Sequence, residues 1–398
     1  MRILYDHQVF SLQNAGGASR YHYELMRALC ETGAPANARQ DMHADVHTEV
    51  RADVDTDVDT DVYTEAWLGL HDSAYPFLAL RGAHARVLSC GHALGRGKPR
   101  YLVNELLSNA LAPFAGTMDI YHPTLYRRMP LVRARRLVVT HHDCAHERFP
   151  ELFSNAAAII AAKRRLYAAA DAIICVSESS RQDLFRFYGT GAAKTRVIHH
   201  GLRPLAGSAA AAVALRSLSP ELPENYLLFV GSRAPYKNFN ALLQAFQGSG
   251  LGQSMSLLVA GGGPLTGEER ALAQKLGIDR RLVVVPAIAD AVLAEAYKSA
   301  RLLVYPSRCE GFGFPPLEAM AAGCPALVGR TSSLPEICRD AAFYFDPEDP
   351  ASLERELIAA ATDEPAWERA RRRGAEVAAL YSWRKCAEET LALYRECQ

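Results

Sequence analysis

Two carboxylates flank a glycine-rich turn in the segment SRCEGFGFPPLEAMAAGCP, which runs from Ser307 to Pro325. Glu310 comes directly before the Gly-Phe-Gly-Phe turn, and Glu318 follows two prolines eight residues later. Proline suits the first turn of a helix, so we expect a helix to begin at the prolines, with Glu318 in its first turn and Gly323 near its end.

Carboxylates placed in this way can bind polyols. Glu318 could accept two hydrogen bonds from a vicinal diol such as that of a ribose, and Glu310 could accept from a second polyol. Gly311 and Gly313 would let backbone N–H groups approach the same ligand closely. The alternative for Glu318 is stabilisation of a helix N-terminus, worth roughly 0.3 to 1 kcal/mol, but that role does not explain the turn before it.

Two cations follow an earlier apolar run in VGSRAPYKNFNALL. Arg233 and Lys237 fall in the loop between an expected strand and an expected helix, for which Asn238 is the predicted N-cap. Ligands of open α/β sheets bind at the carboxyl ends of the strands, and two cations there can bind a diphosphate. The other interpretation is a pair of solvated surface charges.

A glycine pair near the N-terminus is a candidate anion site. Gly16 and Gly17 precede a helix expected from about Ser19 to Cys30, and a helix N-terminus offers unpaired N–H groups to a ligand. The spacing is not G-x-G-x-x-G, so the dinucleotide-binding fingerprint is absent, and such a pair is often only a turn.

Histidines end an expected strand in VVTHHDCAHERFP. A histidine such as His142, at a strand end, could hydrogen-bond a sugar hydroxyl or a phosphate, although a single histidine is more often structural. His141, His142 and His146 together would suggest a metal site, but strand alternation points the first two to opposite faces. We therefore predict no metal here.

An acidic repeat of four residues runs from Ala44 to Trp67 and contains D-x-D pairs such as Asp53/Asp55 and Asp57/Asp59. Such pairs bind metal ions in some sugar transferases, but a tandem repeat creates them automatically. We interpret the segment as a solvated excursion or an edge hairpin.

The elements that position these residues alternate between strand and helix in both halves of the chain. Alternation of this kind predicts parallel sheets covered on both faces, and 398 residues suffice for two domains. The alanine-rich segment 204–223 fits a connector better than a packed element. We therefore predict one domain over residues 1–203 and a second over 224–380.

Composition limits the possible partners and location. The chain has 44 basic and 44 acidic residues, so no global field attracts nucleic acid. Its start lacks the apolar region of a signal peptide, and no stretch approaches 18 uninterrupted apolar residues, so a cytoplasmic location is expected. The nine cysteines are scattered without C-x-x-C pairs, which argues against disulfides and a structural zinc site.

A basic stretch precedes the histidine-bearing strand. It could be an exposed loop, or a patch that binds pyrophosphate or an anionic lipid surface. We favour the patch, which would place the protein peripherally on the inner face of a membrane. Its five cations are Arg127, Arg128, Arg133, Arg135 and Arg136.

Taken together, these segments resemble the retaining GT-B glycosyltransferases of family 4. The matching segments are GGASRYHYEL, VVTHHD, CVSESSRQDL, VIHHGL, VGSRAPYKN, LLVAGGGP and YPSRCEGFGFPPLEAMAAGCPALVG. The last carries the E-x₇-E signature of the family in Glu310 and Glu318. The resemblance implies an α/β fold of two Rossmann-like domains facing each other across a crevice, with residues 381–398 crossing back to the first domain.

The resemblance also implies roles for the candidate residues. Arg233 and Lys237 would hold the diphosphate of a nucleotide sugar, and Glu318 would bind its ribose. The donor sugar would be bound by Glu310, His142 and the backbone of Gly311, Phe312 and Gly313, and the glycine pair Gly16 and Gly17 would approach the phosphate. No metal or other cofactor is implied, because the two cations neutralise the charge of the leaving group. Family members keep the anomeric configuration, and the chain offers no convincing protein nucleophile.

The opening YDHQVFSLQNAGGASRY is most similar to bacterial mannosyltransferases of surface polysaccharide synthesis. GDP-mannose is therefore the expected donor, and a lipid-linked or polysaccharide glycan the expected acceptor. His200, where the family usually has Asn, and the acidic repeat both depart from the pattern on the acceptor side. The alternatives are a UDP- or dTDP-sugar donor, a soluble acceptor, and an inactive scaffold that binds nucleotide sugar.

Overall fold

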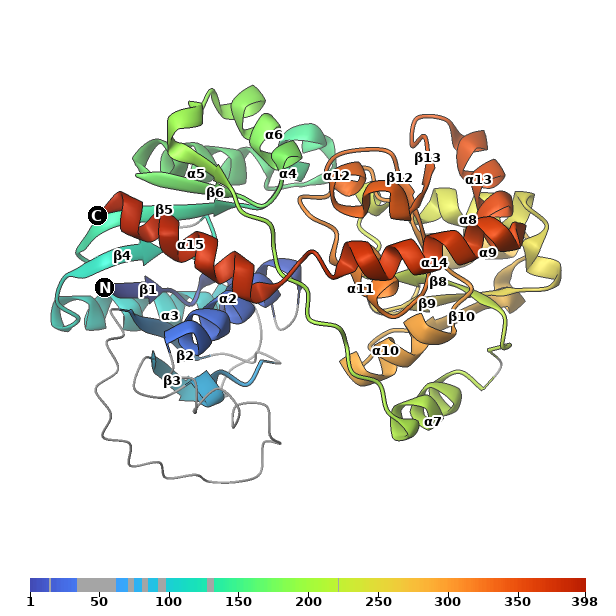
Figure 1. Ribbon diagram of the computed structural model, residues 1–398, viewed down its shortest axis with the longest axis horizontal. Coiled ribbons are helices and arrows are strands. Elements are labelled where there is room, and N and C mark those ends of the chain that lie inside the picture. The colour runs from blue at the N-terminus through green and yellow to red at the C-terminus, as the bar shows by residue number, and fades with distance from the viewer. Residues whose placement is uncertain are drawn as a thin grey trace.

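The computed structural model describes residues 1–13, 16–33, 62–70, 75–80, 85–91, 98–126, 132–220 and 222–398. Figure 1 shows two α/β domains side by side, each with helices around a central sheet. Every strand pairing in the described residues is parallel. The predicted α/β class with two parallel-sheet domains is confirmed.

The first domain has a seven-stranded sheet in the order β3-β2-β1-β4-β5-β6-β7. Its strands are β1 Arg2–Tyr5, β2 Tyr63–Leu70, β3 Ala85–Gly91, β4 Met118–His122, β5 Ala134–His141, β6 Ala172–Cys175 and β7 Thr195–Val197. Its helices are α1 Gln8–Leu12, α2 Gly17–Gly33, α3 Lys98–Leu111, α4 Ala145–Arg148, α5 Ala156–Ala169 and α6 Glu178–Tyr188.

The second domain has a six-stranded sheet in the order β10-β9-β8-β11-β12-β13. Its strands are β8 Tyr226–Val230, β9 Ser256–Ala260, β10 Leu282–Val285, β11 Leu302–Tyr305, β12 Ala326–Gly329 and β13 Phe343–Phe345. Its helices are α8 Phe239–Gly248, α9 Gly267–Lys275, α10 Asp290–Ser299, α11 Phe314–Ala321, α12 Leu334–Cys338, α13 Pro350–Thr362 and α14 Glu364–Ala378.

The central strands are apolar along their whole length because helices cover both of their faces. Every residue of β8, β9 and β11 is buried. Strands buried on both faces appear as continuous apolar runs, without the polar and apolar alternation of a half-exposed sheet. The strands of the second domain are therefore recognisable in the sequence as short apolar runs.

The segment 204–223 links the two domains, but it is not free of packed structure. It contains the helix α7, Ala209–Leu218, whose N-cap Ser208 accepts a hydrogen bond from the N–H of Ala211. Ala211 and Leu215, one turn apart, are buried in the core of the second domain. The expectation of an unpacked connector was wrong. Alanine is common in linkers, but it is also the strongest helix former.

The end of the acidic repeat belongs to the sheet. Residues 44–61 lie outside the described part of the chain, whereas Tyr63–Leu70 forms β2 and pairs with both β1 and β3. Ala66 and Trp67 are buried, and the carboxylate of Glu65 binds Arg2 at 2.5 Å. A solvated excursion or edge hairpin is therefore wrong for this end of the repeat, because its apolar side chains continue the domain core.

The last helix, α15 (Trp383–Cys397), lies on the first domain. Figure 1 shows the chain leaving the second domain through α14 and crossing to α15 beside α2. Trp383, Cys386 and Tyr394 are buried in the first domain's core. The hydroxyl of Tyr394 is 2.8 Å from that of Tyr5 and 2.5 Å from Nδ1 of His122, which fixes the helix against β1 and β4.

Within the described residues, no helix combines the length and apolar character that crossing a membrane requires.

Candidate functional site

The two domains meet at the carboxyl ends of their strands. Ser177, the N-cap of α6 in the first domain, donates through its hydroxyl to the carbonyl of Gly311 in the second at 2.8 Å. The Glu336 carboxylate on α12 accepts hydrogen bonds from the backbone N–H groups of Glu178 and Ser179 at 2.8 and 3.0 Å. This edge of each sheet is where ligands of open α/β folds bind.

Glu336 also lies 2.7 Å from Nε2 of His199. Burial raises the pKa of the Glu336 carboxyl, but the hydrogen bonds from His199 and from the start of α6 outweigh it and lower that pKa. The carboxylate therefore offsets the partial positive charge at the N-terminus of α6 in the other domain. Sequence reasoning did not find this contact, since its partners are over 130 positions apart.

Lys237 and Glu310, both predicted to bind the same ligand, contact each other. Lys237 ends a short 3₁₀ turn, Pro235–Lys237, after β8, and its Nζ donates to Glu310 Oε1 at 2.5 Å and to the Tyr305 hydroxyl at 2.8 Å. Ser332 and Ser333 bind the backbone N–H and C=O of Glu310, each at 2.9 Å. The carboxylate and the ammonium thus sit on a fixed backbone.

The helix α8 begins after Asn238, as predicted, but without a side-chain cap. Asn238 occupies the N-cap position, but its φ is 59°, and its side chain makes no capping hydrogen bond. Asparagine tolerates this left-handed conformation better than most residues. The predicted N-cap position is confirmed, but Asn238 serves the sharp turn after Lys237 and does not cap α8 through its side chain.

Glu318 lies on α11, which begins one residue before the predicted start. Gly313, at φ 99°, is the N-cap, and the helix starts at Phe314, so Glu318 is its fifth residue and lies beyond the first turn. Its side chain is 3% exposed and accepts a hydrogen bond from the Tyr297 hydroxyl at 2.9 Å. Stabilisation of a helix N-terminus therefore does not account for this buried carboxylate.

The main partner of Glu318 comes from the other domain. Arg20 on α2 forms an ion pair with Glu318, and its second amino group lies 3.4 Å from Asp290, the first residue of α10. Burial lowers the pKa of the Arg20 guanidinium, but the charges of Glu318 and Asp290 outweigh this and raise it above its usual value. Sequence reasoning missed Arg20, although a cation near a helix N-terminus, where it opposes the helix dipole, was a usable signal.

Arg233 has different partners from Lys237. Its Nε is 3.0 Å from both carboxylate oxygens of Glu269, and its amino groups donate to the carbonyls of Gly261, Gly262, Gly263 and Pro264. The side chain is only 4% exposed. Arg233 holds the loop after β9, and among the described residues its hydrogen-bond partners differ from those of Lys237.

Glycine is required where the loop of Glu310 meets the first domain. A Cβ built on Gly311 would lie 1.7 Å from the carbonyl oxygen of His142, a distance that no side chain can occupy. A Cβ on Gly17 would lie 3.8 Å from the ring of Phe314. The carbonyl of Gly16 accepts from the Ser19 hydroxyl at 3.1 Å. The glycine pair therefore borders the start of α11, next to Arg20.

His142 lies in a cluster of aromatic rings. Its ring centroid is 5.4 Å from that of Tyr21, 5.8 Å from that of His22 and 6.0 Å from that of His200. Burial lowers the pKa of His142 to about 4, so the ring is neutral at ordinary pH. Its Nε2 is buried and has no hydrogen-bond partner among the described residues, which leaves one polar atom for a ligand.

His200 and Phe312 extend the same cluster. The His200 ring stacks on that of Phe314 at 5.2 Å and 3° and lies 6.1 Å from that of Trp383. Phe312 is buried and contacts the rings of His200 and Tyr381. His200 therefore contacts the loop of residues 310–313, here called the donor loop, together with Tyr21 of α2 and Trp383 of α15. Phe312 is a core residue at the junction of the domains.

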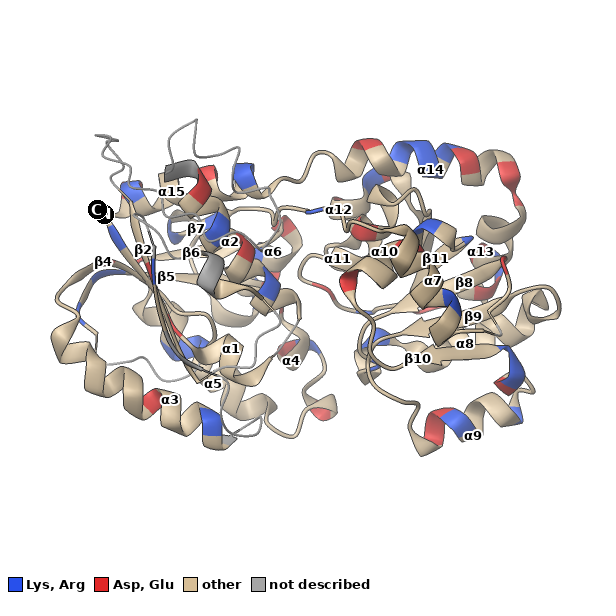
Figure 2. Cartoon of the chain, turned by 90° about the horizontal axis from the view of Figure 1, so that it is seen from below, with Lys and Arg blue, Asp and Glu red and all other residues tan. Residues whose placement is uncertain are grey.

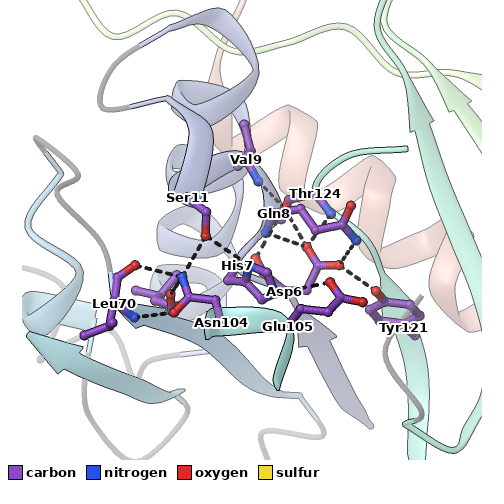
Figure 3. Close-up of polar contacts among 11 residues, drawn as sticks. Asp6, His7, Gln8, Val9, Ser11, Leu70, Asn104, Glu105, Tyr121 and Thr124 are labelled. Carbon is purple, nitrogen blue, oxygen red and sulfur yellow. Dashed lines mark hydrogen bonds and ion pairs between the residues drawn. The ribbon is translucent and has the colours of Figure 1, made fainter. Parts of the chain in front are cut away.

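A buried polar network fixes the loop after β1 (Figure 3). Asp6 is 1% exposed, and its carboxylate accepts from the Tyr121 hydroxyl at 2.5 Å and the Thr124 hydroxyl at 2.6 Å. The amide N–H groups of Gln8 and Thr124 also donate to it. The loop that leads toward the glycine pair is thereby held at the carboxyl end of β1.

The predicted basic patch lies away from this site. Arg127 and Arg128 fall outside the described residues, while Arg133, Arg135 and Arg136 lie at the start of β5, the opposite end of the strand from His142. Arg135 is 3.7 Å from Asp119, and Arg136 is 3.2 Å from Asp171. Arg135 and Arg136 also line a surface hollow together with Met1, Asp119 and Gln398. The residues at β5 therefore cannot bind a pyrophosphate at the junction of the domains.

Two family models match the chain, one over each domain. The model described as "Glycosyltransferase Family 4" matches residues 50–204, and the one described as "Glycosyl transferases group 1" matches residues 215–377. The O-antigen chain mannosyltransferase B of Escherichia coli is 30% identical over 295 residues, which cover 69% of this chain and 74% of that protein.

Solved structures share the fold over the whole chain. The sucrose-phosphate synthase of Thermosynechococcus elongatus superposes with a TM-score of 0.71 at 20% sequence identity, covering 99% of this chain and 98% of the synthase. Anabaena Alr3699/HepE in complex with UDP and glucose superposes with a TM-score of 0.67 at 17% identity, and both chains are covered completely.

Proposed function

Because this chain belongs to the GT-B glycosyltransferases of family 4, we propose that it transfers a hexose, most simply mannose from GDP-mannose, to a lipid-linked or polysaccharide acceptor. The observation that carries the proposal is the meeting of Lys237, Glu310 and Glu318 with the first domain at the carboxyl ends of both sheets. The mannose donor rests on the similarity to the O-antigen mannosyltransferase.

Different residues of the second domain bind different parts of the donor. Lys237 binds the diphosphate and stabilises the charge that develops on the leaving nucleotide, as a fixed cation does in a partly buried site. Glu318 accepts hydrogen bonds from the ribose hydroxyls, and Glu310 accepts from the sugar, whose hydroxyls also meet the backbone at 311–313. Arg233 acts indirectly, because its guanidinium holds the loop of Gly261–Gly263 beside that diphosphate.

His142 contributes from the first domain. Its neutral ring presents an unpartnered Nε2 at the junction, where it hydrogen-bonds a sugar hydroxyl near the reacting carbon. In the proposed retaining reaction the bond from the anomeric carbon to the diphosphate breaks, and the acceptor oxygen bonds on the same face. The acceptor proton passes to the leaving phosphate oxygen, so no protein nucleophile and no metal ion are required.

Other donors and acceptors remain alternatives with their own support. The likeness to a structure that holds UDP and glucose favours a UDP-sugar, and that to a sucrose-phosphate synthase favours a soluble acceptor. An inactive nucleotide-sugar-binding scaffold is the alternative of another class, and the intact set of Lys237, Glu310 and Glu318 opposes it.

Calorimetric binding of GDP, UDP, dTDP and ADP tests the proposal. Each is titrated into the wild type, Glu318→Ala and the control Glu268→Ala, an exposed carboxylate of the same domain, first without metal and then with Mg²⁺. We expect one nucleotide to bind without metal and the Glu318 variant alone to lose it. No binding by any nucleotide, or binding that needs Mg²⁺ and ignores Glu318, would overturn the site. Release of GDP from GDP-mannose then checks the sugar.

A further inference from the structure

The outer face of α3 is unusually apolar for a surface helix. In the stretch 99–114, which runs through α3 and the 3₁₀ turn Ala112–Phe114, every exposed residue is apolar. Figure 2 shows α3 on the outside of the first domain and largely without charge colour. We call the "α3 face" its four large exposed side chains: Leu102, 60% exposed, Leu106, 70%, Leu111, 41%, and Phe114, 87%.

Two polar residues of this stretch, Asn104 and Glu105, bind groups of the first domain's interior. Asn104 is buried and binds the backbone of Leu70 and the Ser11 hydroxyl (Figure 3). Glu105, the one acidic residue of the stretch, has a side chain 16% exposed and lies 3.9 Å from the His7 ring. The inner side of α3 thus supplies the core and the polar network, and the exposed residues of its outer side are apolar. A contiguous exposed apolar surface of this kind normally marks an interaction site.

Cations border the end of the α3 face that carries Phe114. Arg2 donates to the carbonyl of Ala115 at 3.0 Å, and the backbone of Arg133 accepts from the N–H of Met118, which opens the next strand. Arg133 is exposed, and the Arg135 side chain is 74% exposed. The neighbouring carboxylates are Glu65, which is buried against Arg2, and Asp119, near Arg135. Counting these five groups, the border carries an excess of positive charge.

We propose that the α3 face, with Arg133 and Arg135 beside it, docks on an anionic lipid bilayer. Leucine and phenylalanine enter the boundary of the acyl chains while the flanking guanidinium groups remain among the anionic headgroups. The proposal rests on the lipid-linked acceptor of the proposed function, which must be met at a membrane. The sequence predicted that arginines alone contact the membrane. In this proposal the apolar α3 face makes the main contact, and the arginines border it.

Cosedimentation of the full chain with vesicles tests the surface. The vesicles are phosphatidylcholine, with or without phosphatidylglycerol, and no nucleotide or acceptor is added. The variant Leu106→Gln/Phe114→Ser is compared with Val213→Ser/Leu218→Gln, which removes two similarly exposed side chains, 65% and 55%, from α7. We expect the wild type and the α7 control to bind the anionic vesicles, and the α3 variant to bind at least roughly tenfold more weakly. Arg133→Glu/Arg135→Glu is expected to weaken binding only to the anionic vesicles.

A second readout reports insertion directly. Phe114→Trp should shift its emission to the blue on anionic vesicles and be quenched by brominated lipid, while Leu218→Trp should show neither effect. Equal vesicle binding by wild type and α3 variant overturns the proposal, as does a wild type that binds no vesicle. A wild-type dimer that the α3 variant converts to a monomer, without vesicle binding, would assign the face to a second copy. Because no nucleotide is present, a failure of the donor assignment leaves these outcomes unaffected.

Discussion

The guanidinium of Arg20 on α2 forms an ion pair with the carboxylate of Glu318 on α11, and this contact joins the two domains through the residue proposed to bind ribose. The Glu318 side chain is 3% exposed, and within the described part of the chain Arg20 and the hydroxyl of Tyr297 are the partners that offset the cost of burying its charge. A carboxylate so enclosed is costly once a partner leaves. Nucleotide binding must therefore exchange one set of hydrogen bonds on Glu318 for another.

Removing Arg20 should destabilise the nucleotide-free protein, and removing Glu318 as well should restore part of the loss. Arg20→Met leaves a buried charge with one hydrogen bond, and we expect a loss of about 1 to 3 kcal/mol in the free energy of unfolding, reduced by the partial exposure of Arg20. A double-mutant cycle with Glu318→Gln, measured by urea unfolding, should give a coupling energy of similar size.

Asp290→Asn provides the matched control for this cycle. Its carboxylate also faces Arg20, at 3.4 Å, but its side chain is 71% exposed, so its removal should change the free energy of unfolding by less than about 1 kcal/mol. Additive effects of Arg20→Met and Glu318→Gln would show that the ion pair does not couple the two domains.

Lys237 and Arg233 should separate into a binding role and a structural role. Lys237→Met should weaken nucleoside diphosphate binding at least roughly tenfold, because it removes a charge-assisted contact to phosphate. Arg233→Met should instead lower the free energy of unfolding by about 2 to 4 kcal/mol, because it leaves Glu269 and the carbonyls of the loop after β9 without their donor.

Calorimetry and urea unfolding of both variants test this division. Lys275→Met, an exposed lysine at the end of α9, is the control for charge removal. If Arg233→Met keeps the wild-type unfolding curve and loses nucleotide binding, the guanidinium contacts the diphosphate itself, and the division is wrong.

Gly311→Ala should prevent the donor loop from reaching the first domain. The added Cβ would lie 1.7 Å from the backbone oxygen of His142, which cannot rotate away as a side chain could. We expect sugar transfer to fall at least roughly a hundredfold while nucleotide binding by the second domain changes little. Gly267→Ala, whose Cβ would meet nothing within 4 Å, is the control. Equal loss of both functions would mean that the substitution disturbs the second domain itself.

The alternation of strands and helices could be predicted from the sequence because strands buried on both faces are continuous apolar runs. The error at 204–223 arose because composition alone does not separate a flexible linker from an alanine-rich helix such as α7. The end of the acidic repeat was misread for a related reason. Its four-residue period conceals that Tyr63–Leu70 forms a strand, five consecutive residues of which are buried.

Some residues of the candidate site could be predicted from the sequence, and others could not. Lys237, Glu310 and Glu318 could be located because each follows a recognisable strand or turn. Arg20 and Glu336 were missed because their partners lie in the other domain, although Arg20 near a helix N-terminus offered a local signal. Tyr297 was missed because its contact with Glu318 joins two helices, and its own helix lies outside the candidate motifs. The start of α11 at Phe314 was missed because the left-handed Gly313 can cap the helix one residue ahead of the prolines.

Histidine rings enclosed by the fold should make the protein sensitive to moderate acid. Burial lowers the pKa of His142 to about 4 and that of His122 to about 3, and lowers the pKa values of His22 and His200 well below 6.5. These rings stay neutral in the folded chain but take up protons near pH 6.5 once unfolded. Their contribution to stability is therefore complete above about pH 6.5 and is lost as the pH falls toward about 4.

His200→Asn tests this at the position where family 4 usually carries asparagine. Each histidine that is protonated only on unfolding adds up to about 1.4 kcal/mol of stability change per pH unit, so the variant should show a shallower decline between about pH 6 and 5. The measurement is the urea unfolding free energy of both proteins across that range, where the carboxylates they share contribute equally and cancel. Parallel pH profiles would mean that His200 takes up its proton in the folded state as well, in contact with solvent despite its stack on Phe314.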